Sequence, residues 1–132
     1  MRSFHLEVAT PDGSAYCGEA ESLLVRTDSG DVEILAGHAD YIAALAVGRA
    51  RIRTSEGERV AAISGGFLSV DKKSVKLVAT TFEFADEIDI NRAKAAKEKA
   101  EEFLRKAKDD REMVIAKAKL ARAMTRINVA NK

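Results

Sequence analysis

The chain has 132 residues, of which 46% are hydrophobic and 33% are charged, enough for one domain or for one small domain with an appendage. Its 22 Lys and Arg residues nearly balance its 21 Asp and Glu residues, so the overall charge does not indicate binding to nucleic acid or to an anionic membrane. The single cysteine, Cys17, excludes an intramolecular disulfide and is typical of a reducing compartment. We expect its side chain to be buried or half-buried.

The sequence contains no signal for membrane insertion. The first residues alternate between polar and apolar side chains and lack the apolar block of a signal peptide. No apolar stretch approaches the length of a transmembrane helix. We therefore expect a cytosolic protein that reaches a membrane only through another protein.

The first part of the chain, residues 4–82, has the two-residue periodicity of β-strands. Phe4, Leu6 and Val8 alternate with polar residues, and this run ends at the turn sequence TPDG. Further apolar or alternating runs are separated by the turn sequences DSGD, SEGE and DKKS. Roughly eight to ten strands, each of about five to eight residues, predict an antiparallel β-sandwich or flattened barrel over residues 1–85.

From residue 86 onward the periodicity changes to that of α-helices. Asp89 stands at an N-cap position, before Ile90 and a run rich in Ala, Lys and Glu. The sequence KDDR interrupts this run, and a second helix is predicted from about Asp110. The predicted fold class is therefore α+β, with an antiparallel two-helix hairpin over residues 86–132. The predicted contact stripes are Ala93, Ala96, Ala100, Phe103, Leu104 and Ala107 on the first helix, and Met113, Ala116, Leu120, Ala123 or Met124, and Ile127 on the second.

The predicted hairpin has little apolar surface with which to hold itself together. Much of its contact stripe is alanine, so each contact between the two helices buries only a small side chain. Separating such helices costs correspondingly little. We therefore expect the hairpin to depend on support from outside itself and to exchange one support for another.

The sequence contains no recognisable catalytic or metal-binding constellation. His5 and His38 have no cysteine and no second histidine at the spacing of a metal-binding motif, so we predict no metal site. Ser64 lacks a histidine and a carboxylate in a recognisable catalytic arrangement. The glycines that follow it do not form a nucleotide-binding loop, and we interpret them as a position of close backbone approach. The prediction is a protein that is not an enzyme.

The second predicted helix carries a concentration of positive charge. The last twenty residues of the chain contain five cations and no anion. Lys119, Arg122 and Arg126 are three and four residues apart, which places them on one face of a helix. The pattern fits either a solvated basic face or an anion site, because guanidinium groups hold phosphates through charge-assisted hydrogen bonds. In a closed hairpin, Arg122 and Arg126 would come near Asp89 and Arg92.

Four stretches of the chain together resemble the epsilon subunit of bacterial F-type, proton-translocating ATP synthases. They are TPDG near the start, DSGDVEILAGH at 28–38, SGGFLSV at 64–70, and the alanine-rich charged hairpin at the end. The resemblance covers essentially the whole chain. It implies a non-catalytic subunit whose β-sandwich docks on the gamma subunit and on the membrane c-ring, within the central rotor.

The resemblance also implies that the hairpin is regulatory. Folded down, it packs on the sandwich; extended, it reaches along gamma into the alpha/beta catalytic head and inhibits ATP hydrolysis. Its basic residues there meet an acidic segment of a beta subunit, and the residues suited to this contact are Lys117, Lys119, Arg122 and Arg126. The implied location is the cytoplasmic face of the bacterial plasma membrane, reached through the complex without direct membrane insertion.

The chain further contains the motif I/L-D-x-x-R-A, through which some bacterial members of this family bind ATP in the folded hairpin. The motif is intact as Ile88, Asp89, Ile90, Asn91, Arg92 and Ala93. The resemblance adds Glu83, Arg122 and Arg126 to the implied site. Carboxylates can accept hydrogen bonds from adenine or ribose, and arginines can hold phosphates. ATP, with or without magnesium, is thus the implied regulatory ligand, and no covalent cofactor is expected.

A second class of function stays open on the residues alone. The chain fits a binding module whose basic helical face meets nucleic acid or another acidic partner. The basic face lacks interleaved aromatic residues and the net charge is only +1, and both features disfavour nucleic acid. We therefore predict a non-catalytic central-stalk subunit, in which ATP favours the folded, non-inhibitory hairpin.

Overall fold

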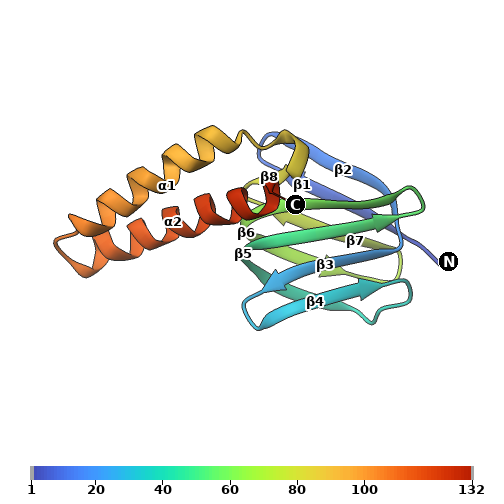
Figure 1. The fold of residues 1–132 in the computed structure, drawn as a ribbon. Helices are drawn as coiled ribbons and strands as arrows, with labels where there is room; N and C mark the ends of the chain where they lie inside the picture. The colour runs from blue at the N-terminus through green and yellow to red at the C-terminus, as the bar shows by residue number, and fades with distance from the viewer. Residues whose placement is uncertain (1, 132) are drawn as a thin grey trace. The chain divides into compact units, whose positions relative to one another are not determined.

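The computed structural model describes residues 2–131 and separates the chain into two compact units on either side of the Phe84–Ala85 bond. The first unit is built of β-strands and the second of helices; in Figure 1 the strands are coloured from blue to yellow and the two long helices from orange to red. None of the helices in residues 2–131 combines the length and the hydropathy that a membrane span requires.

The strands of the first unit follow the alternation and the turns of the sequence. They are β1 (Phe4–Thr10), β2 (Gly13–Ala20), β3 (Ser22–Thr27), β4 (Gly30–Leu35), β5 (Tyr41–Thr54), β6 (Gly57–Val70), β7 (Ser74–Ala79) and β8 (Phe82–Phe84). The turn sequences TPDG, DSGD, SEGE and DKKS connect β1 to β2, β3 to β4, β5 to β6 and β6 to β7. Each predicted turn is therefore a turn in the structure.

The strands form one sheet in the order β2-β1-β7-β6-β5-β3-β4, with β8 beside β6. β2 and β5 are not neighbours in this order, yet they are in contact, so the sheet folds over on itself as a sandwich. The predicted fold class is confirmed, with two differences in detail. β1 pairs with β7 in parallel, and β5 and β6 each have 14 residues, longer than the predicted strands.

The length of β6 has a physical reason, which is that the strand serves two partners in succession. Residues 61–63 pair with β8, and residues 66–70 pair with β7. Gly65 and Gly66 stand between these segments with φ angles of 93° and 125°. A Cβ at Gly66 would overlap the carbonyl oxygen of Val78. The close backbone approach predicted at these glycines is thereby confirmed, although they lie inside a strand rather than before one.

The core of the first unit is made from the inward-facing residues of its strands. Burial follows the alternation along β1, whereas along β5 the buried positions change from odd to even numbers between Leu45 and Ala50. The fully buried large side chains of this core are Leu6, Val8, Leu23, Val25, Ile34, Ile52, Leu68 and Leu77. Tyr41, Tyr16 and Phe4 pack against this cluster from its margin.

The second unit consists of a short 3-10 helix, η1 (Ala85–Glu87), followed by α1 (Ile90–Arg105) and α2 (Asp110–Ala130). Asp89 caps α1, where its carboxylate accepts a hydrogen bond from the N–H of Arg92 at 3.1 Å. Asp109 caps α2 in the same way, accepting from the N–H of Glu112 at 2.8 Å. The predicted helix starts at Ile90 and Asp110 are confirmed.

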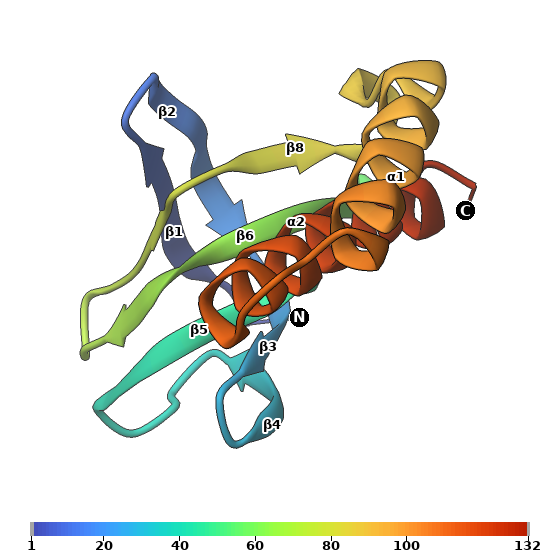
Figure 2. The same ribbon diagram turned by 90° about the vertical axis from the view of Figure 1, so that its left-hand side faces the viewer.

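A narrow seam of alanines joins α1 to α2, which lie side by side in Figures 1 and 2. The buried residues along it are Ala93 and Ala100 on α1, and Ala116 and Ala123 on α2. Each pair is seven residues apart, so in an antiparallel hairpin Ala93 lies level with Ala123 and Ala100 with Ala116. Half-buried residues border the seam; they are Leu104, Leu120 and Ile127.

The seam is narrower than the sequence predicted. Ala96, Phe103 and Met113 were expected on the contact stripe, yet all three are exposed. The reason is that the buried positions repeat every seven residues, and a residue three positions from a buried alanine lies about 60° around the helix from it, at the margin of the contact. Of the two alternatives Ala123 and Met124, the structure buries Ala123.

Candidate functional site

The predicted nucleotide motif spans the last residues before α1 and its first turn. Asp89 is exposed and caps the helix, Ile88 is half-buried, and Ala93 is buried in the seam. Arg92 is exposed beside them, and its backbone N–H is the group that Asp89 caps. Two of the four named positions, Asp89 and Ala93, therefore have a structural function in the hairpin itself.

Two further predicted residues lie on the facing helix at the same level. Arg122 and Arg126 are half-buried on α2, on either side of Ala123 in the sequence. Because Ala123 lies level with Ala93, both arginines lie at the level of the first turn of α1. Arg92 precedes Ala93 by one residue and shares that level. Three arginines from two helices therefore lie at the level of the open end of the hairpin.

The open end of the hairpin carries both positive and negative groups, and the positive groups favour an anionic ligand. Arg122 forms no salt bridge within residues 2–131. The amino-terminal end of α1 adds the partial positive charge of its unpaired N–H groups. On the opposing side, η1 contacts α2 and contributes the exposed carboxylates of Asp86 and Glu87. An anionic ligand would gain most from Arg92 and Arg122, on the two sides of the hairpin.

Glu83, the remaining residue of the predicted nucleotide site, belongs to the first unit. It lies at the centre of β8, where it is half-buried and pairs with Ala62 of β6. The other predicted residues, from Ile88 to Arg126, belong to the second unit. The predicted contact of Glu83 with the nucleotide therefore stays a prediction.

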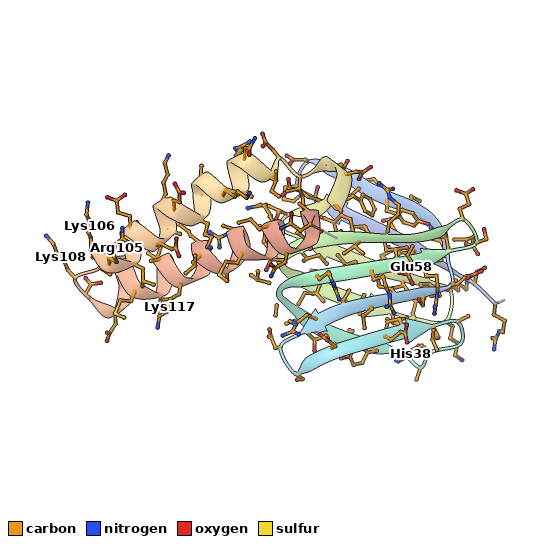
Figure 3. All side chains as sticks on the ribbon, in the orientation of Figure 1. His38, Glu58, Arg105, Lys106, Lys108 and Lys117 are labelled. Carbon is orange, nitrogen blue, oxygen red and sulfur yellow. The ribbon has the colours of Figure 1, made fainter. Side chains whose placement is uncertain are left out.

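The four basic residues expected to contact a beta subunit do not form one continuous face. Lys117 is exposed and points away from α1 in Figure 3. It lies roughly 140° around the helix from Arg122, since each residue turns an α-helix by about 100°. Lys119 is also exposed, and its Nζ lies 5.4 Å from the centre of the Phe103 ring on α1. This cation–π contact was not predicted, and it covers part of the apolar ring that the narrow seam leaves exposed.

A second cluster of potential metal-binding side chains, not predicted from the sequence, lies on the outer face of β1 and β2. Cys17 is exposed, not buried or half-buried as predicted, because it faces outward from an edge strand. Its partner across the strand pair is Glu7, and His5 is two residues along β1 on the same face. Spacing along the chain does not bring these residues together; the signal that reveals the cluster is the register of the two strands.

Comparison with known proteins matches both units to one family. Residues 3–85 match the ATP synthase delta/epsilon chain β-sandwich domain, and residues 86–131 match the long α-helix domain of the same chains. The ATP synthase epsilon chain of Bacillus pumilus is 38% identical over 132 residues, covering 100% of both chains. That of Ruminiclostridium cellulolyticum is 40% identical over 132 residues, covering 100% of this chain and 98% of the relative.

The chain belongs to the ATP synthase delta/epsilon chain family. The resemblance stated from the sequence is confirmed, and with it the prediction of a non-catalytic chain of the ATP synthase. The family fold is also present in a chain of the Euglena gracilis mitochondrial ATP synthase, in a structure that contains OSCP, F1 and the c-ring. That chain has a TM-score of 0.84 at 22% identity, with 98% of this chain and 82% of that one covered.

Proposed function

We propose that this chain is the epsilon subunit of the central stalk of an F-type ATP synthase and that ATP regulates it by binding to its helical hairpin. The full-length likeness to ATP synthase epsilon chains supports the first part. The partners are the gamma subunit and the c-ring for the β-sandwich, and the alpha/beta catalytic head for the hairpin. The chain itself performs no chemical step; it couples the rotor and controls hydrolysis.

The observation that carries the ATP proposal is the burial of both Ala93 and Ala123 in a pair of contacting helices. In an antiparallel hairpin these two alanines lie at one level, which supports a site shared by Arg92 of α1 and by Arg122 and Arg126 of α2. Three guanidinium groups suit a triphosphate, because each can donate two parallel hydrogen bonds to phosphate oxygens. The carboxylate of Asp89 at the start of α1 accepts from adenine or ribose donors.

ATP bound in this way acts as a clamp on the hairpin. Its phosphates contact arginines from both helices, so ATP binds the closed hairpin and not the separated helices. At a hundredfold excess over its dissociation constant it would stabilise the closed state by about 2.7 kcal/mol. That amount shifts a near-balanced equilibrium decisively, because the alanine seam resists separation only weakly. Low ATP then releases the helices to extend and inhibit hydrolysis.

The experiment that tests the site is a calorimetric titration of ATP into the full chain, with and without magnesium. We expect saturable one-to-one binding that weakens about tenfold or more in Arg122→Ala and in Arg126→Ala, because each loses charge-assisted bonds of about 1.5–3 kcal/mol. Asp89→Ser keeps a capping oxygen but shortens its reach, so it should also weaken binding while α1 remains helical.

Lys117→Ala is the matched control for this titration. It removes a cation from α2 that points away from α1, so ATP affinity should not change. Absence of saturable binding at millimolar ATP would reduce Asp89 to a helix cap and place regulation in the protein partners alone. Equal affinity in the wild type and both arginine variants would overturn the site while leaving the family membership intact.

A further inference from the structure

The outer face of β1 and β2 brings together three side chains of the kinds that bind transition metals. Glu7 and Cys17 are directly opposite each other in the antiparallel pair, and His5 precedes Glu7 by two residues on the same face. One potential ligand atom from each residue, a ring nitrogen, a carboxylate oxygen and a thiol sulfur, lies within 4.8 Å of the other two. His5 and Glu7 are half-buried and Cys17 is exposed, so an ion can reach them from solvent.

One pair in this cluster already has nearly the separation of two metal ligands. Cys17 Sγ lies 3.8 Å from His5 Nε2. Zinc–sulfur and zinc–nitrogen bonds of about 2.3 and 2.0–2.1 Å at a tetrahedral angle place the two ligand atoms about 3.6 Å apart. A small rotation of the Glu7 side chain would bring its carboxylate into the set of three metal ligands. No change of the backbone is needed.

A second carboxylate lies near the other ring nitrogen of the histidine. Glu19 is opposite His5 in the strand pair, and its Oε2 lies 3.7 Å from His5 Nδ1. Its other oxygen accepts a hydrogen bond from Ser3 Oγ at 2.9 Å. A carboxylate at Nδ1 favours the tautomer with Nδ1 protonated, which leaves the Nε2 lone pair directed towards Cys17.

We propose that His5, Glu7 and Cys17 form a binding site for a divalent transition metal, of which zinc is the best match. One nitrogen, one oxygen and one sulfur ligand suit zinc, whereas magnesium and calcium prefer oxygen alone. Three protein ligands leave a fourth position for water or for a group from a partner. Glu19 supports the site through His5 without touching the metal.

The neighbouring strand β7 limits the affinity of this site. Lys76 is opposite Glu7 in the parallel pair of β1 with β7, so its ammonium group opposes a bound cation and competes for the Glu7 carboxylate. Binding must overcome this repulsion. Lys76→Gln removes this positive charge and should therefore strengthen metal binding at the cluster. Nonspecific binding of metal elsewhere on the surface would not predict this increase.

Cobalt(II) is the probe for the test, because its bond to a thiolate produces a charge-transfer absorption band. Cys17 is the only cysteine, so any such band must come from it. Titration of the full chain under a non-chelating reductant should give one cobalt per chain, displaced by zinc. Cys17→Ser should abolish the band. His5→Gln and Glu7→Gln should each weaken cobalt binding by about tenfold or more, because even the loss of a residue that only supports a metal ligand typically lowers metal affinity by this factor.

The chain supplies a matched control in its second histidine. His38→Gln leaves the cluster intact, so cobalt affinity should equal that of the wild type. Three results would overturn the proposal: no thiolate band, a band of unchanged affinity in both His5→Gln and Glu7→Gln, or saturation at half a cobalt per chain, which would indicate a bridge between two copies. Circular dichroism separates these from misfolding, because the ligand side chains face outward and their variants should retain the sandwich.

Discussion

At the residue scale, Asp71 shows how a single side chain organises a connection between strands. Its Oδ1 accepts hydrogen bonds from the N–H groups of Lys73 at 2.8 Å and Ser74 at 2.9 Å, which closes the turn from β6 to β7. The backbone hydrogen bond from Ser74 and then that from Lys73 lower the pKa of Asp71 below 3.8, with a smaller contribution from the charge of Lys76. The folded state therefore favours the ionised form.

This depressed pKa predicts a pH dependence of the sandwich. The contribution of Asp71 to the free energy of unfolding is complete above its unfolded pKa of 3.8 and is lost as pH falls through the lower folded pKa. Asp71→Asn keeps an accepting oxygen but cannot titrate, so part of the acid sensitivity should disappear. Urea midpoints measured between about pH 2 and pH 6 test this. An unchanged pH dependence in the variant would contradict the assignment.

The nucleotide residues also combine two functions at this scale. Asp89 caps α1, and Ala93 fills the seam, whether or not ATP is bound. Their presence in the sequence is therefore explained by the hairpin alone. Arg122 is different, because it forms no salt bridge within residues 2–131 and is neither a helix cap nor one of the buried seam residues. Arg122 is the residue whose substitution best separates ligand binding from helix stability.

At the element scale, the seam between α1 and α2 determines how easily the hairpin opens. Its buried contacts are methyl groups at two levels, so little apolar surface is exposed when the helices part. The backbone hydrogen bonds and both N-caps are internal to each helix, so parting the helices breaks none of them directly. Each helix can therefore exchange the seam for another supporting surface, which suits an element that changes partners.

Enlarging one seam residue should open the hairpin. Ala123→Leu forces extra methyl groups between close-packed helices and should destabilise the closed hairpin by about 1–3 kcal/mol. Ala121→Leu is the matched control, because Ala121 is exposed on the same helix and its change should fall within about 0.5 kcal/mol. Amide hydrogen exchange along α1 and α2 reports the opening. Similar exchange in both variants would show that the seam does not hold the hairpin.

The two sides of α2 predict two separable functions. Lys117 lies on the side away from α1, so Lys117→Ala should relieve inhibition of ATP hydrolysis in a reassembled ATP synthase. Arg122→Ala should weaken ATP binding, because Arg122 is at the level of the first turn of α1, and it should relieve inhibition at ATP concentrations too low to close the hairpin. Hydrolysis rates of the complex and ATP titrations of the isolated chain make the comparison. Full inhibition with Lys117→Ala would exclude Lys117 from the beta-subunit contact.

At the scale of the whole molecule, the two units differ in what holds them together. The main core cluster comes entirely from the first unit, from Leu6 to Phe84, and includes large aliphatic and aromatic side chains. The contact between α1 and α2 relies mainly on alanines. Burial of apolar surface is the dominant stabilising contribution in folding, so only the first unit has what it needs to fold alone.

Truncation tests this difference. A chain that ends at residue 85 should retain the β-sandwich, with a cooperative thermal transition followed by circular dichroism. A peptide of residues 86–132 should lose much of its helical signal in dilute solution and regain part of it when ATP is added, if ATP clamps the two helices. Loss of the cooperative transition in the truncated sandwich would show that its stability depends on the hairpin.

The sequence by itself determined the local features of this protein. Alternation predicted β1, the turn sequences predicted where strands end, and Asp89 predicted the start of α1, because each depends on residues that are close together in the chain. The sequence also predicted the nucleotide motif, because its six residues, 88–93, are consecutive. These features follow from backbone preferences and short-range hydrogen bonds.

Only the tertiary structure decided which distant residues meet. The parallel pairing of β1 with β7, the burial of Ala93 but not Ala96, and the meeting of Cys17 with Glu7 depend on register between separate elements. A shift of one residue would turn Cys17 to the other face of its strand, and no local preference specifies that register. Register is set by the packing of the whole core and of the helical seam, and therefore emerges only when the chain is folded.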